Sequence, residues 1–297
     1  MTIASASGAL IEILGQYKDQ VDRWLEEQLV TLGDKGPLRD ACEYALLSGG
    51  KRYRPAVVLM MAKALGGTVD VMDAALAAEF FHAASLIADD LPCMDNDDER
   101  RNKPAVHKVF GESVALLASY SLIAAGYQAL FRCGRALEEG GLGDAAQRCC
   151  MAGENISDNL GIDGAAGGQY MDLFPPNLEE VTLREVLHKK TVTLFESSFL
   201  MGWLYGGGDT SRTEDVKALA NHFGIAFQIA DDLGDMDQDA DNDRDVNYAA
   251  VLGKAEALSA VKQEVQAYFD GLKSLNIASD ELTGLGAGLL LRAQLRA

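Results

Sequence analysis

Apolar residues recur at intervals of three and four in nearly every segment of the chain, which is the spacing of amphipathic α-helices. Alternation with period two, which marks β-strands, is almost absent. All six prolines lie at or before Pro176, so the chain beyond it has no helix breaker other than glycine. The sequence therefore predicts an all-α fold, a single large bundle of roughly ten or more helices around a central cavity. With boundaries uncertain by about 2 to 4 residues, we expect helices near 8–32, 37–48, 54–65, 70–91, 112–138, 143–161, 179–206, 213–235, 253–274 and 279–295.

The composition fits one large globular domain that spans residues 1–297. The chain is 48% hydrophobic, and no low-complexity linker divides it. Its formal net charge of -19 argues against nucleic acid or anionic lipid as a partner. Five cysteines without metal-binding spacing indicate a reducing compartment. Because the N-terminus also lacks the pattern of a secretory signal, we expect a cytoplasmic protein.

One uncharged stretch, Val114 to Phe131, is long enough to be considered as a membrane span. It contains polar residues such as Ser119 and Gln128, and no other stretch of this kind exists in the sequence. We therefore expect no transmembrane segment. The stretch is better explained as a central helix that is buried on all sides.

A nearly identical nonapeptide occurs twice, as IADDLPCMD from Ile87 and as IADDLGDMD from Ile229. Each copy stands at the end of an apolar stretch, so the pattern suggests two carboxylate clusters that face one cavity. Oxygen-only clusters suit Mg2+, which binds one or two carboxylates and completes its shell with water and substrate phosphate. The match continues upstream, with phenylalanine and alanine at equal distances before both aspartate pairs. The two helices are therefore either pseudo-equivalent walls of one cavity or a coincidence of similar helices.

The spacing of the aspartates differs between the copies. Asp231, Asp232 and Asp235 fall within one helical turn, where like charges repel unless a cation neutralises them. Asp89 and Asp95 are about 240° apart on a continuous helix and could not share a face. We therefore expect the proline at position 92 to end the first helix, so that Asp95 folds back. The alternative for each cluster is a solvated helix end.

The acidic run after the second copy resembles a calcium-binding loop, because aspartates alternate from Asp235 to Asp245. An EF-hand loop needs glycine at its sixth position and glutamate at its twelfth. Counting from Asp235 gives Ala240 and Val246, so the calcium hypothesis fails. Beyond Asp237 we expect an exposed acidic loop.

Basic residues cluster near two of these features. One trio follows the Gly49-Gly50 pair and the other follows the first acidic motif: Lys51, Arg52 and Arg54, and Arg100, Arg101 and Lys103. Arginine presents a planar fork of donors that suits phosphate, although surface salt bridges would also account for either trio. Two further segments, Lys190-Thr191 and Gly167-Gly168-Gln169 with Asp172, carry little weight alone.

Taken together, these segments resemble the trans-polyprenyl diphosphate synthases. That family carries GGKRxRP, ExxHxxSLIHDDLPxMDxDxxRRGxP, GGQxxD, KT and FQxxDDxxD in this order. Here the segments read GGKRYRP at 49–55, EFFHAASLIADDLPCMDNDDERRNKP at 79–104, GGQYMD at 167–172, Lys190-Thr191, and FQIADDLGD at 227–235. The stretch LPCMDNDD followed by HKVFGESVALLA is most similar to the short-chain branch that makes farnesyl or geranylgeranyl diphosphate.

The resemblance implies an enzyme, a Mg2+-dependent prenyltransferase that condenses isopentenyl diphosphate with dimethylallyl, geranyl or farnesyl diphosphate. Six aspartates would hold Mg2+: Asp89, Asp90, Asp95, Asp231, Asp232 and Asp235. The catalytic residues would be Asp89, Asp90, Lys190 and Asp231. The allylic diphosphate would contact Arg100, Lys190 and Gln228, beside Thr191 and Phe227. Isopentenyl diphosphate would bind Lys51, Arg54, His82 and Arg101. The resemblance also implies a homodimer.

Small residues before the first motif predict the length of the product. Ala84 and Ser85 stand where relatives that make farnesyl diphosphate often place an aromatic ring, so a growing chain could pass them. Phe81, one turn deeper, would then be the floor of the tunnel. We expect a product of about twenty carbons, geranylgeranyl diphosphate, with the fifteen-carbon farnesyl diphosphate as the alternative.

The sequence departs from the family pattern at several positions. Ala88 replaces a histidine, Asn102 a glycine, and Ser119-Tyr120 a Gly-Asp pair. The basic residues that follow the second motif are also missing, since 238–248 offers only Arg244. A terpene cyclase or a low-activity regulatory subunit are therefore further alternatives, although the second aspartate pair argues against a cyclase. We expect activity to survive because both metal clusters and Lys190 remain.

Overall fold

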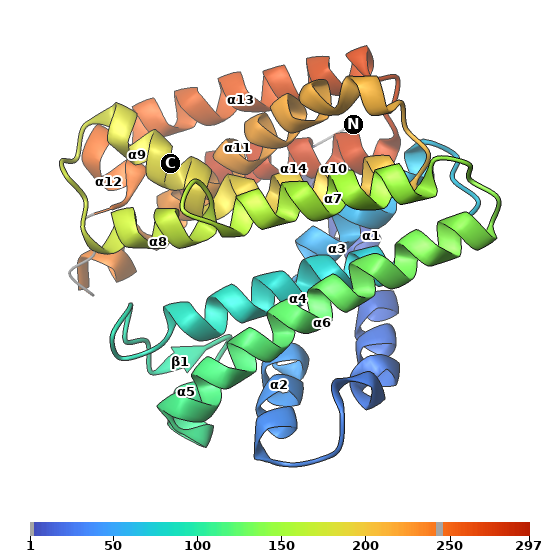
Figure 1. The fold of residues 1–297 in the computed structure, drawn as a ribbon. Coiled ribbons are helices and arrows are strands. Elements are labelled where there is room, and N and C mark those ends of the chain that lie inside the picture. The colour runs from blue at the N-terminus through green and yellow to red at the C-terminus, as the bar shows by residue number, and fades with distance from the viewer. Residues whose placement is uncertain (1–2, 242–245) are drawn as a thin grey trace.

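The computed structural model describes residues 3–241 and 246–297, and it confirms the all-α prediction. Long helices cross one another in stacked layers, with α4 and α6 in the lower half of Figure 1 and α7, α11 and α13 in the upper half. The main helices are α1 (Ile3–Gln28), α2 (Pro37–Leu47), α3 (Tyr53–Ala64), α4 (Met72–Asp89), α6 (Glu112–Glu139), α7 (Ala145–Leu160), α9 (Glu180–Leu187), α10 (Thr193–Tyr205), α11 (Thr213–Asp241), α13 (Lys254–Ser274) and α14 (Asp280–Arg296).

Short elements that the apolar spacing did not predict connect these helices. They are α5 (Val106–Phe110), α8 (Ala165–Leu173), α12 (Tyr248–Leu252), the 3-10 turn η3 (Thr210–Arg212), and the strands β1 (Glu99–Arg100) and β2 (Lys103–Pro104). Two further short turns, the 3-10 turn η1 (Leu29–Leu32) and the π-helical turn η2 (His188–Val192), fall within predicted helices. Each is too short to show a periodic pattern in the sequence. Several of them nevertheless carry residues of the site described below.

The strands β1 and β2 form a small antiparallel hairpin after the first acidic motif. Its two turn residues, Arg101 and Asn102, have φ angles of 58° and 60°. Positive φ at both central residues is typical of a type I′ turn, which matches the twist of a hairpin. Left-handed backbone is costly for an arginine and is found mostly at functional sites. The hairpin therefore fixes the direction of Arg101.

The region 179–206 was predicted as one helix, and it is helical throughout, with the π-turn η2 between α9 and α10. A single wide turn of this kind inside a helix frequently marks a functional site. The predicted loop beyond Asp237 is wrong for the backbone, because α11 continues to Asp241. No glycine or proline follows Gly234 within that helix, so nothing in the backbone stops it. The side chains of 237–245, including Arg244, lie outside the described residues.

The expectation that the helix over Val114 to Phe131 is buried on all sides is wrong. In α6, Leu117 is 50% exposed and Tyr120 is 59% exposed. The opposite face packs closely on α4, with small residues along the contact. Alanine and leucine both count as apolar in the sequence pattern, so the pattern did not distinguish the exposed face of α6 from the buried one.

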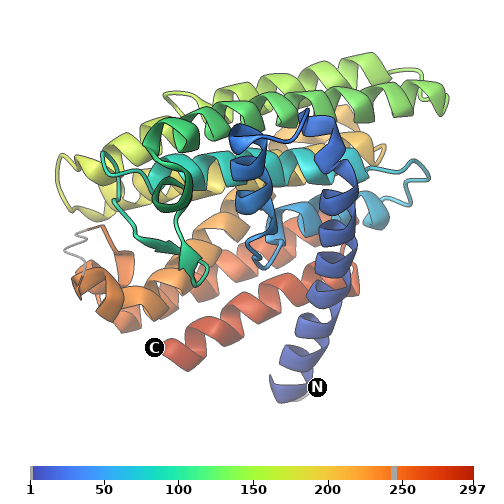
Figure 2. The same ribbon diagram turned by 90° about the horizontal axis from the view of Figure 1, so that it is seen from below.

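Helix α6 is the one described helix that is long and apolar enough to cross a membrane by length and composition. It lies within the bundle, where it contacts α2, α4 and α7. In Figure 2 the helices α6 and α7 run side by side along the top edge of the molecule.

The first and last helices of the chain pack against each other. Helix α14 packs against α1, α3, α11 and α13, so the last helix of the chain lies beside the first one. This arrangement brings arginines from the C-terminal helix close to the second acidic motif on α11.

Candidate active site

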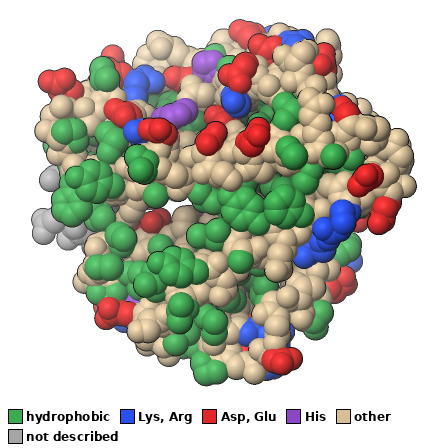
Figure 3. All heavy atoms as spheres, viewed as in Figure 1, with side chains coloured by type: hydrophobic (Ala, Val, Ile, Leu, Met, Phe, Trp, Pro, Cys, Tyr) green, Lys and Arg blue, Asp and Glu red, His purple; other side chains and the backbone are tan. Residues whose placement is uncertain are grey.

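A cavity of about 1140 Å³ lies between the two halves of the bundle. Residues from both acidic motifs line it, together with residues from the Gly49–Arg54 segment, α8 and η2. Figure 3 shows the surface hollowed between the upper and lower halves. The two helices that carry the repeated nonapeptide therefore end at the same cavity, as the sequence suggested.

At the first motif, α4 ends at Asp89 and the loop after Pro92 turns back. The backbone N–H of Asp95 donates to the carbonyl of Asp89 at 2.9 Å, which confirms the predicted fold-back. Both side chains line the cavity. Burial raises the pKa of Asp89 to about 7, and repulsion from Asp95 and Asp90 adds to this, while Lys190 opposes it. A cation bound here would remove that repulsion.

Asp90 has a different environment from Asp89. It is 2% exposed and is not among the residues that line the cavity. Its Oδ1 accepts a hydrogen bond of 2.9 Å from Nε of Arg100 and a second one from the same guanidinium. Arg100 lines the cavity and also donates to Asp97 at 2.9 Å. Asp90 therefore supports Arg100, and its role as a metal ligand and catalytic residue stays a prediction.

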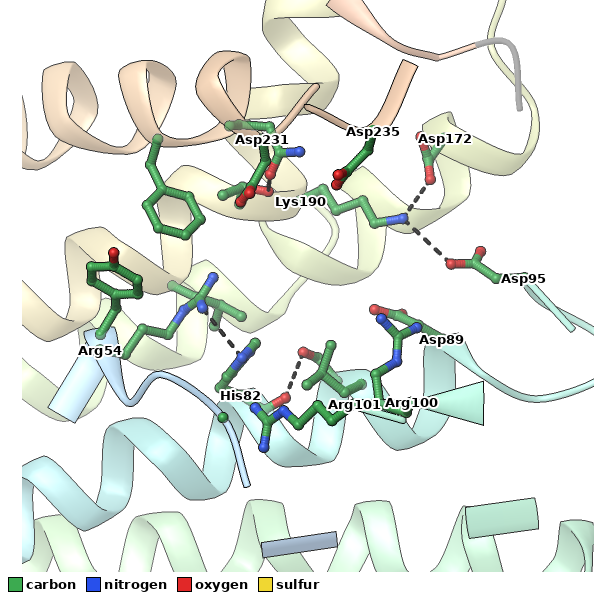
Figure 4. A pocket seen from close by; sticks show the side chains of 18 of the residues that line it. Arg54, His82, Asp89, Asp95, Arg100, Arg101, Asp172, Lys190, Asp231 and Asp235 are labelled. Atoms are coloured by element: carbon green, nitrogen blue, oxygen red, sulfur yellow. Dashed lines mark hydrogen bonds and ion pairs between the residues drawn. The ribbon is translucent and has the colours of Figure 1, made fainter. Parts of the chain in front are cut away.

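At the second motif, Asp231 and Asp235 project into the cavity from α11 (Figure 4). Asp232 is buried and anchored, because it accepts hydrogen bonds from Gln228 Nε2 at 2.8 Å and from the backbone N–H of Tyr248 at 2.9 Å. In each aspartate pair, therefore, the second carboxylate is held by hydrogen bonds within the protein, although Asp232, unlike Asp90, also lines the cavity.

Two predicted substrate contacts also bind each other. Thr191 Oγ1 donates to Gln228 Oε1 at 2.8 Å, and Gln228 in turn donates to Asp232. Phe227 lines the cavity beside them, with its ring centroid 4.8 Å from that of Phe195. This hydrogen-bonded chain fixes the direction of the side chains along one wall.

Lys190 connects the two halves of the site. It donates to Asp172 of α8 and lies 3.8 Å from a carboxylate oxygen of Asp95, as Figure 4 shows. Gln169 Nε2 donates to the other oxygen of Asp95 at 2.7 Å. A Cβ on Gly168 would lie 2.3 Å from the backbone nitrogen of Lys190, so only glycine allows α8 to approach η2 this closely.

Gln169 and Asp172 were not among the predicted site residues. Their segment contains a glycine pair, but such a pair alone is also compatible with a helix break, so the sequence did not predict a site there. Only the packing of α8 on η2 brings both side chains to Lys190 and Asp95.

On the opposite side of the cavity, Arg54 and His82 form a buried basic pocket. Arg54 Nη1 is 3.3 Å from His82 Nε2, and its guanidinium lies 4.4 Å from the ring centroid of Phe195. Burial lowers the pKa of Arg54 to about 10, so it stays charged at neutral pH. Burial and the nearby arginines, Arg54 first among them, hold the pKa of His82 well below its usual range, so its imidazole is neutral.

This pocket contains donors without acceptors. Arg54 Nε and His82 Nδ1 are buried and have no hydrogen-bond partner among the described residues. An unpaired buried polar group costs free energy, which a bound anion would recover at Arg54. The pocket therefore suits a phosphate group.

Arg101 and Lys51 are two further basic residues on the same side of the cavity as Arg54. Arg101 donates to the carbonyl of Gly49, and its guanidinium lies 2.5 Å from where a Cβ of Gly50 would stand. Both Lys51 and Arg101 line the cavity. Arg52 of the same trio is instead buried in ion pairs with Glu79 and, at 2.8 Å, with Asp22 of α1.

The three residues predicted to measure product length differ in position. Ser85 lines the cavity. Ala84 is buried, and its carbonyl accepts a hydrogen bond of 2.9 Å from Ser119 of α6. Phe81 packs on α6, with its ring centroid 5.1 Å from that of Tyr127. Ala84 and Phe81 therefore lie between α4 and α6, behind the cavity lining.

The donor set was compared with what Mg2+ requires. Among the described residues, no group of three or more acidic, histidine or cysteine side chains is arranged to hold a metal by itself. The first wall instead offers the cavity Asp89 and Asp95, and the second offers Asp231 and Asp235 together with the hydrogen-bonded Asp232. Because Mg2+ takes one or two carboxylates and fills its remaining positions with water and phosphate, the residues fit this ion.

A protein-family comparison identifies the chain. The family model described as polyprenyl synthetase matches residues 35–246, which is most of the sequence. The chain belongs to the polyprenyl synthetase family. The match includes both acidic motifs, the basic pocket and Lys190, and it confirms the family that the sequence motifs resembled.

Sequence relatives agree with this assignment. The chain is 36% identical over 220 residues to the chloroplastic geranylgeranyl pyrophosphate synthase of Capsicum annuum, which covers 73% of this chain and 58% of the relative. It is also 36% identical over 223 residues to the heterodimeric geranylgeranyl pyrophosphate synthase large subunit 2 of Arabidopsis thaliana, covering 73% of this chain and 57% of the relative. The match thus spans less than three fifths of these relatives.

Solved structures of polyprenyl synthetases share the fold over nearly the whole chain. An FPP/GFPP synthase from Zymomonas mobilis, in its apo structure, has a TM-score of 0.80 at 31% identity and covers 94% of this chain and 98% of its own. A geranyltransferase from Legionella pneumophila has a TM-score of 0.81 at 27% identity and covers 97% and 98%.

Proposed function

We propose that this protein is a Mg2+-dependent trans-prenyltransferase that condenses isopentenyl diphosphate with an allylic diphosphate. The observation that carries the proposal is the placement of two carboxylate pairs on opposite walls of one cavity, beside a buried basic pocket. Two diphosphates need two separate sets of cations, which would be Mg2+ held by the carboxylates for one and the basic pocket for the other. The relatives named as prenyl diphosphate synthases support the same reaction.

The allylic diphosphate would bind between the acidic walls, where Arg100 and Lys190 are held by Asp90 and Asp172. Mg2+ bound to the cavity-facing carboxylates would neutralise the diphosphate as it leaves. Isopentenyl diphosphate would bind Arg54, Lys51 and Arg101 in the basic pocket, with neutral His82 donating a hydrogen bond.

In the reaction, the C–O bond of the allylic diphosphate breaks and the isopentenyl double bond supplies the electrons for a new C–C bond. A proton is then lost from the isopentenyl unit, with the departing diphosphate as its acceptor. No side-chain nucleophile is required. The apolar part of the lining, which includes Leu86, Leu187, Leu194 and Phe227, would keep water from quenching the cation.

We favour geranylgeranyl diphosphate, with twenty carbons, as the product. Ser85 is the small residue that lines the cavity, so the lining leaves room for a longer chain at this position. The plant relatives named as geranylgeranyl pyrophosphate synthases support this length, while farnesyl diphosphate remains the alternative.

Product chromatography tests the proposal. Labelled isopentenyl diphosphate is supplied with dimethylallyl, geranyl or farnesyl diphosphate as separate primers. We expect Mg2+-dependent incorporation with each primer. Incorporation that stops at fifteen carbons would contradict the twenty-carbon product. A complete lack of incorporation, at the level of an Asp89→Ala control, would contradict the reaction and favour a terpene cyclase or an inactive subunit.

We also propose that residues 1–297 form a single domain that assembles as a homodimer in the cytoplasm. The packing of α14 on α1, α3 and α11 supports a single domain. Figure 3 shows hydrophobic side chains gathered on the face of the molecule that it presents. The exposed hydrophobic residues of α6 are Leu116, Leu117, Tyr120 and Phe131. A face of this kind in a folded protein suits a subunit interface.

Light scattering measures the assembly. We expect the mass of a dimer for the purified chain and that of a monomer for Tyr120→Glu. A monomeric parent chain would contradict the homodimer and favour a different partner subunit, as in the relative named heterodimeric. Cell fractionation tests the location, because relatives named chloroplastic and mitochondrial provide two alternatives.

A further inference from the structure

The N-terminal helix α1 is connected to the basic pocket, although it lies before residues 35–246, which the family model matches. Asp22 of α1 forms an ion pair of 2.8 Å with Nε of Arg52. Arg52 lies directly before α3, between Lys51 and Arg54, which line the pocket. The ion pair therefore joins α1 to the segment that carries two contacts of the proposed isopentenyl site.

Arg52 binds three other elements with its guanidinium. Besides the contact with α1, its Nη2 donates to the carbonyl of Leu46 in α2 at 2.6 Å, and its Nη1 donates to Glu79 of α4. Its φ angle of 53° is left-handed, which is costly for an arginine and persists only where the surroundings hold it. Because each of its three side-chain nitrogens has a partner within the protein, Arg52 serves as a support.

Glu79 carries the connection from Arg52 to Arg101. The oxygen that accepts from Arg52, Oε1, also lies 3.9 Å from Nη2 of Arg101. Glu79 is 1% exposed, so the attraction between these charges is only weakly screened by water. A distance of 3.9 Å is too long for a hydrogen bond. The carboxylate therefore attracts the Arg101 guanidinium without engaging that donor.

The backbone beside Arg52 also orients Arg101. Arg101 Nη1 donates to the carbonyl of Gly49, and its guanidinium occupies the space that a side chain of Gly50 would fill. Both glycines have positive φ angles, of 90° and 122°, which glycine adopts readily. Arg101 is thus packed on the same segment that Arg52 ties to α1.

The charges around Arg101 are balanced by the same residues. Burial lowers the pKa of Arg101, and the charges of Arg52 and Arg100 add to this, whereas Glu79 and Asp22 oppose it. Without the Asp22 carboxylate, the Arg52 charge would be less well compensated and would repel Arg101 more strongly. The carboxylate on α1 therefore acts on Arg101 both through contacts and through charge.

We propose that Asp22 is a positioning residue of the isopentenyl diphosphate site. It acts on Arg101 through Arg52 and Glu79, and it lies outside the lining of the cavity that the described residues form. Without it, Arg52 draws the Glu79 carboxylate away from Arg101. The inference rests on the proposed function, because it takes Arg101 as a contact of isopentenyl diphosphate.

Steady-state kinetics of the full-length chain test the effect on each substrate. For Asp22→Ala we expect the KM for isopentenyl diphosphate to rise about three- to tenfold, and the KM for geranyl diphosphate to change less than about twofold. Asp22→Glu should recover part of the loss, because it keeps the carboxylate. The matched control is Asp73→Ala, since Asp73 has nearly the same exposed fraction and forms an ion pair of 2.8 Å with Arg132, outside the cavity lining.

A double-mutant cycle tests whether the effect passes through Arg101. In an Arg101→Gln background, Asp22→Ala should change the isopentenyl KM less than about twofold, because the residue on which it acts is already missing. Equal effects of Asp22→Ala in both backgrounds would overturn the inference. A lower isopentenyl KM for Asp22→Ala alone would also overturn it, because the aspartate would then act only by repelling the anion.

Calorimetric titration with inorganic pyrophosphate provides a readout that does not depend on turnover. Mg2+ is left out, so that the acidic walls repel the anion and it binds the basic pocket. We expect Asp22→Ala to bind pyrophosphate about three- to tenfold more weakly than the parent chain, and Asp73→Ala to bind it as the parent does.

The outcomes separate the inference from the proposed function. An inactive parent chain whose pyrophosphate affinity falls in Asp22→Ala would contradict the reaction and support the positioning role. An active parent chain with unchanged pyrophosphate affinity and isopentenyl KM in Asp22→Ala would overturn the inference alone. If Asp22→Ala does not fold, Asp22→Asn replaces it, because it keeps the shape and removes the charge. We expect a two- to fivefold rise in the isopentenyl KM from that variant, and no rise would contradict the inference.

Discussion

The two IADDL copies face the same cavity, but the backbone after them differs. In the first copy Pro92 ends α4, and the loop returns Asp95 to the cavity, where Gln169 and Lys190 hold it. In the second copy Gly234 stands at the equivalent position, and α11 continues. One wall is thus a helix end beside Arg100 and Lys190, and the other is a continuous helix in which Asp231 pairs with an arginine from α14.

The comparison also separates the two aspartates of each pair. Asp89 and Asp231 are equivalent, and both line the cavity. Asp90 and Asp232 are equivalent as well, and both are buried acceptors, of Arg100 in one case and of Gln228 and Tyr248 in the other. The second carboxylate of each copy is therefore engaged within the protein, and of these two only Asp232 also lines the cavity.

The largest expected effect comes from the first aspartate of each pair. Asp89→Ala and Asp231→Ala should each lower the rate of pyrophosphate release by about 10³-fold or more, because each removes a cavity-facing metal ligand. Asp90→Asn should cost less, about 10- to 100-fold, since it loosens Arg100. A coupled pyrophosphate assay at saturating Mg2+ measures all three. Equal losses at Asp89 and Asp90 would break the distinction between ligand and support.

The next prediction concerns the free energy of unfolding and two equivalent positions, each ten residues before the first aspartate of its motif. Glu79 on α4 forms a buried ion pair with Arg52. At the equivalent position on α11, Oδ1 of Asn221 accepts a hydrogen bond of 3.0 Å from Nδ1 of His188. Glu79→Gln should lower the free energy of unfolding by about 3 to 5 kcal/mol, because Arg52 keeps a buried charge. Asn221→Ala should cost only about 1 kcal/mol.

Urea denaturation, followed by circular dichroism, measures both variants. The exposed ion pair between Lys63 and Glu281 supplies a control, since Lys63→Gln should change the free energy of unfolding by about 1 kcal/mol or less. Similar values for Glu79→Gln and Lys63→Gln would show that burial adds nothing at this pair.

A smaller loss is expected from the residue that makes the two walls different. Pro92→Ala should reduce pyrophosphate release by about 10- to 100-fold, because alanine permits α4 to continue and carries Asp95 away from the cavity. The measurement is the same pyrophosphate assay, with circular dichroism as the control for folding. A variant with the parent rate would mean that the loop folds back without its proline.

The smallest effect on rate, but a visible one on the product, is expected at Ser85. Ser85→Phe places a ring in the cavity lining and should shorten the main product by one five-carbon unit, with the rate changed less than about threefold. Ala84→Phe instead crowds the contact with α6 and should lower the free energy of unfolding by about 1 to 3 kcal/mol. Product chromatography with both variants is the check, and a shorter product from Ala84→Phe alone would reverse the assignment.

Much of the fold was predictable from the sequence, because long helices bury one face and leave a periodic pattern. The backbone fold-back at Pro92 was predictable too, since proline acts locally. The loop predicted beyond Asp237 was wrong as far as Asp241, where α11 ends, because charge alone does not end a helix. The apolar exposed face of α6 was also missed, because Leu117 and Tyr120 look like core residues until the neighbouring helices are placed.

The sequence by itself determined the family, the two acidic motifs and the types of residue that a diphosphate site needs, because each of these is written in short local segments. Only the tertiary structure decided which members of the motifs face the cavity. It placed both Arg52 and Arg54 along the cavity but committed Arg52 to ion pairs with Glu79 and Asp22, while Nε of Arg54 was left without a partner among the described residues. It also brought Arg292 to Asp231 across about sixty residues of sequence, since packing of α14 on α11 fixes that contact.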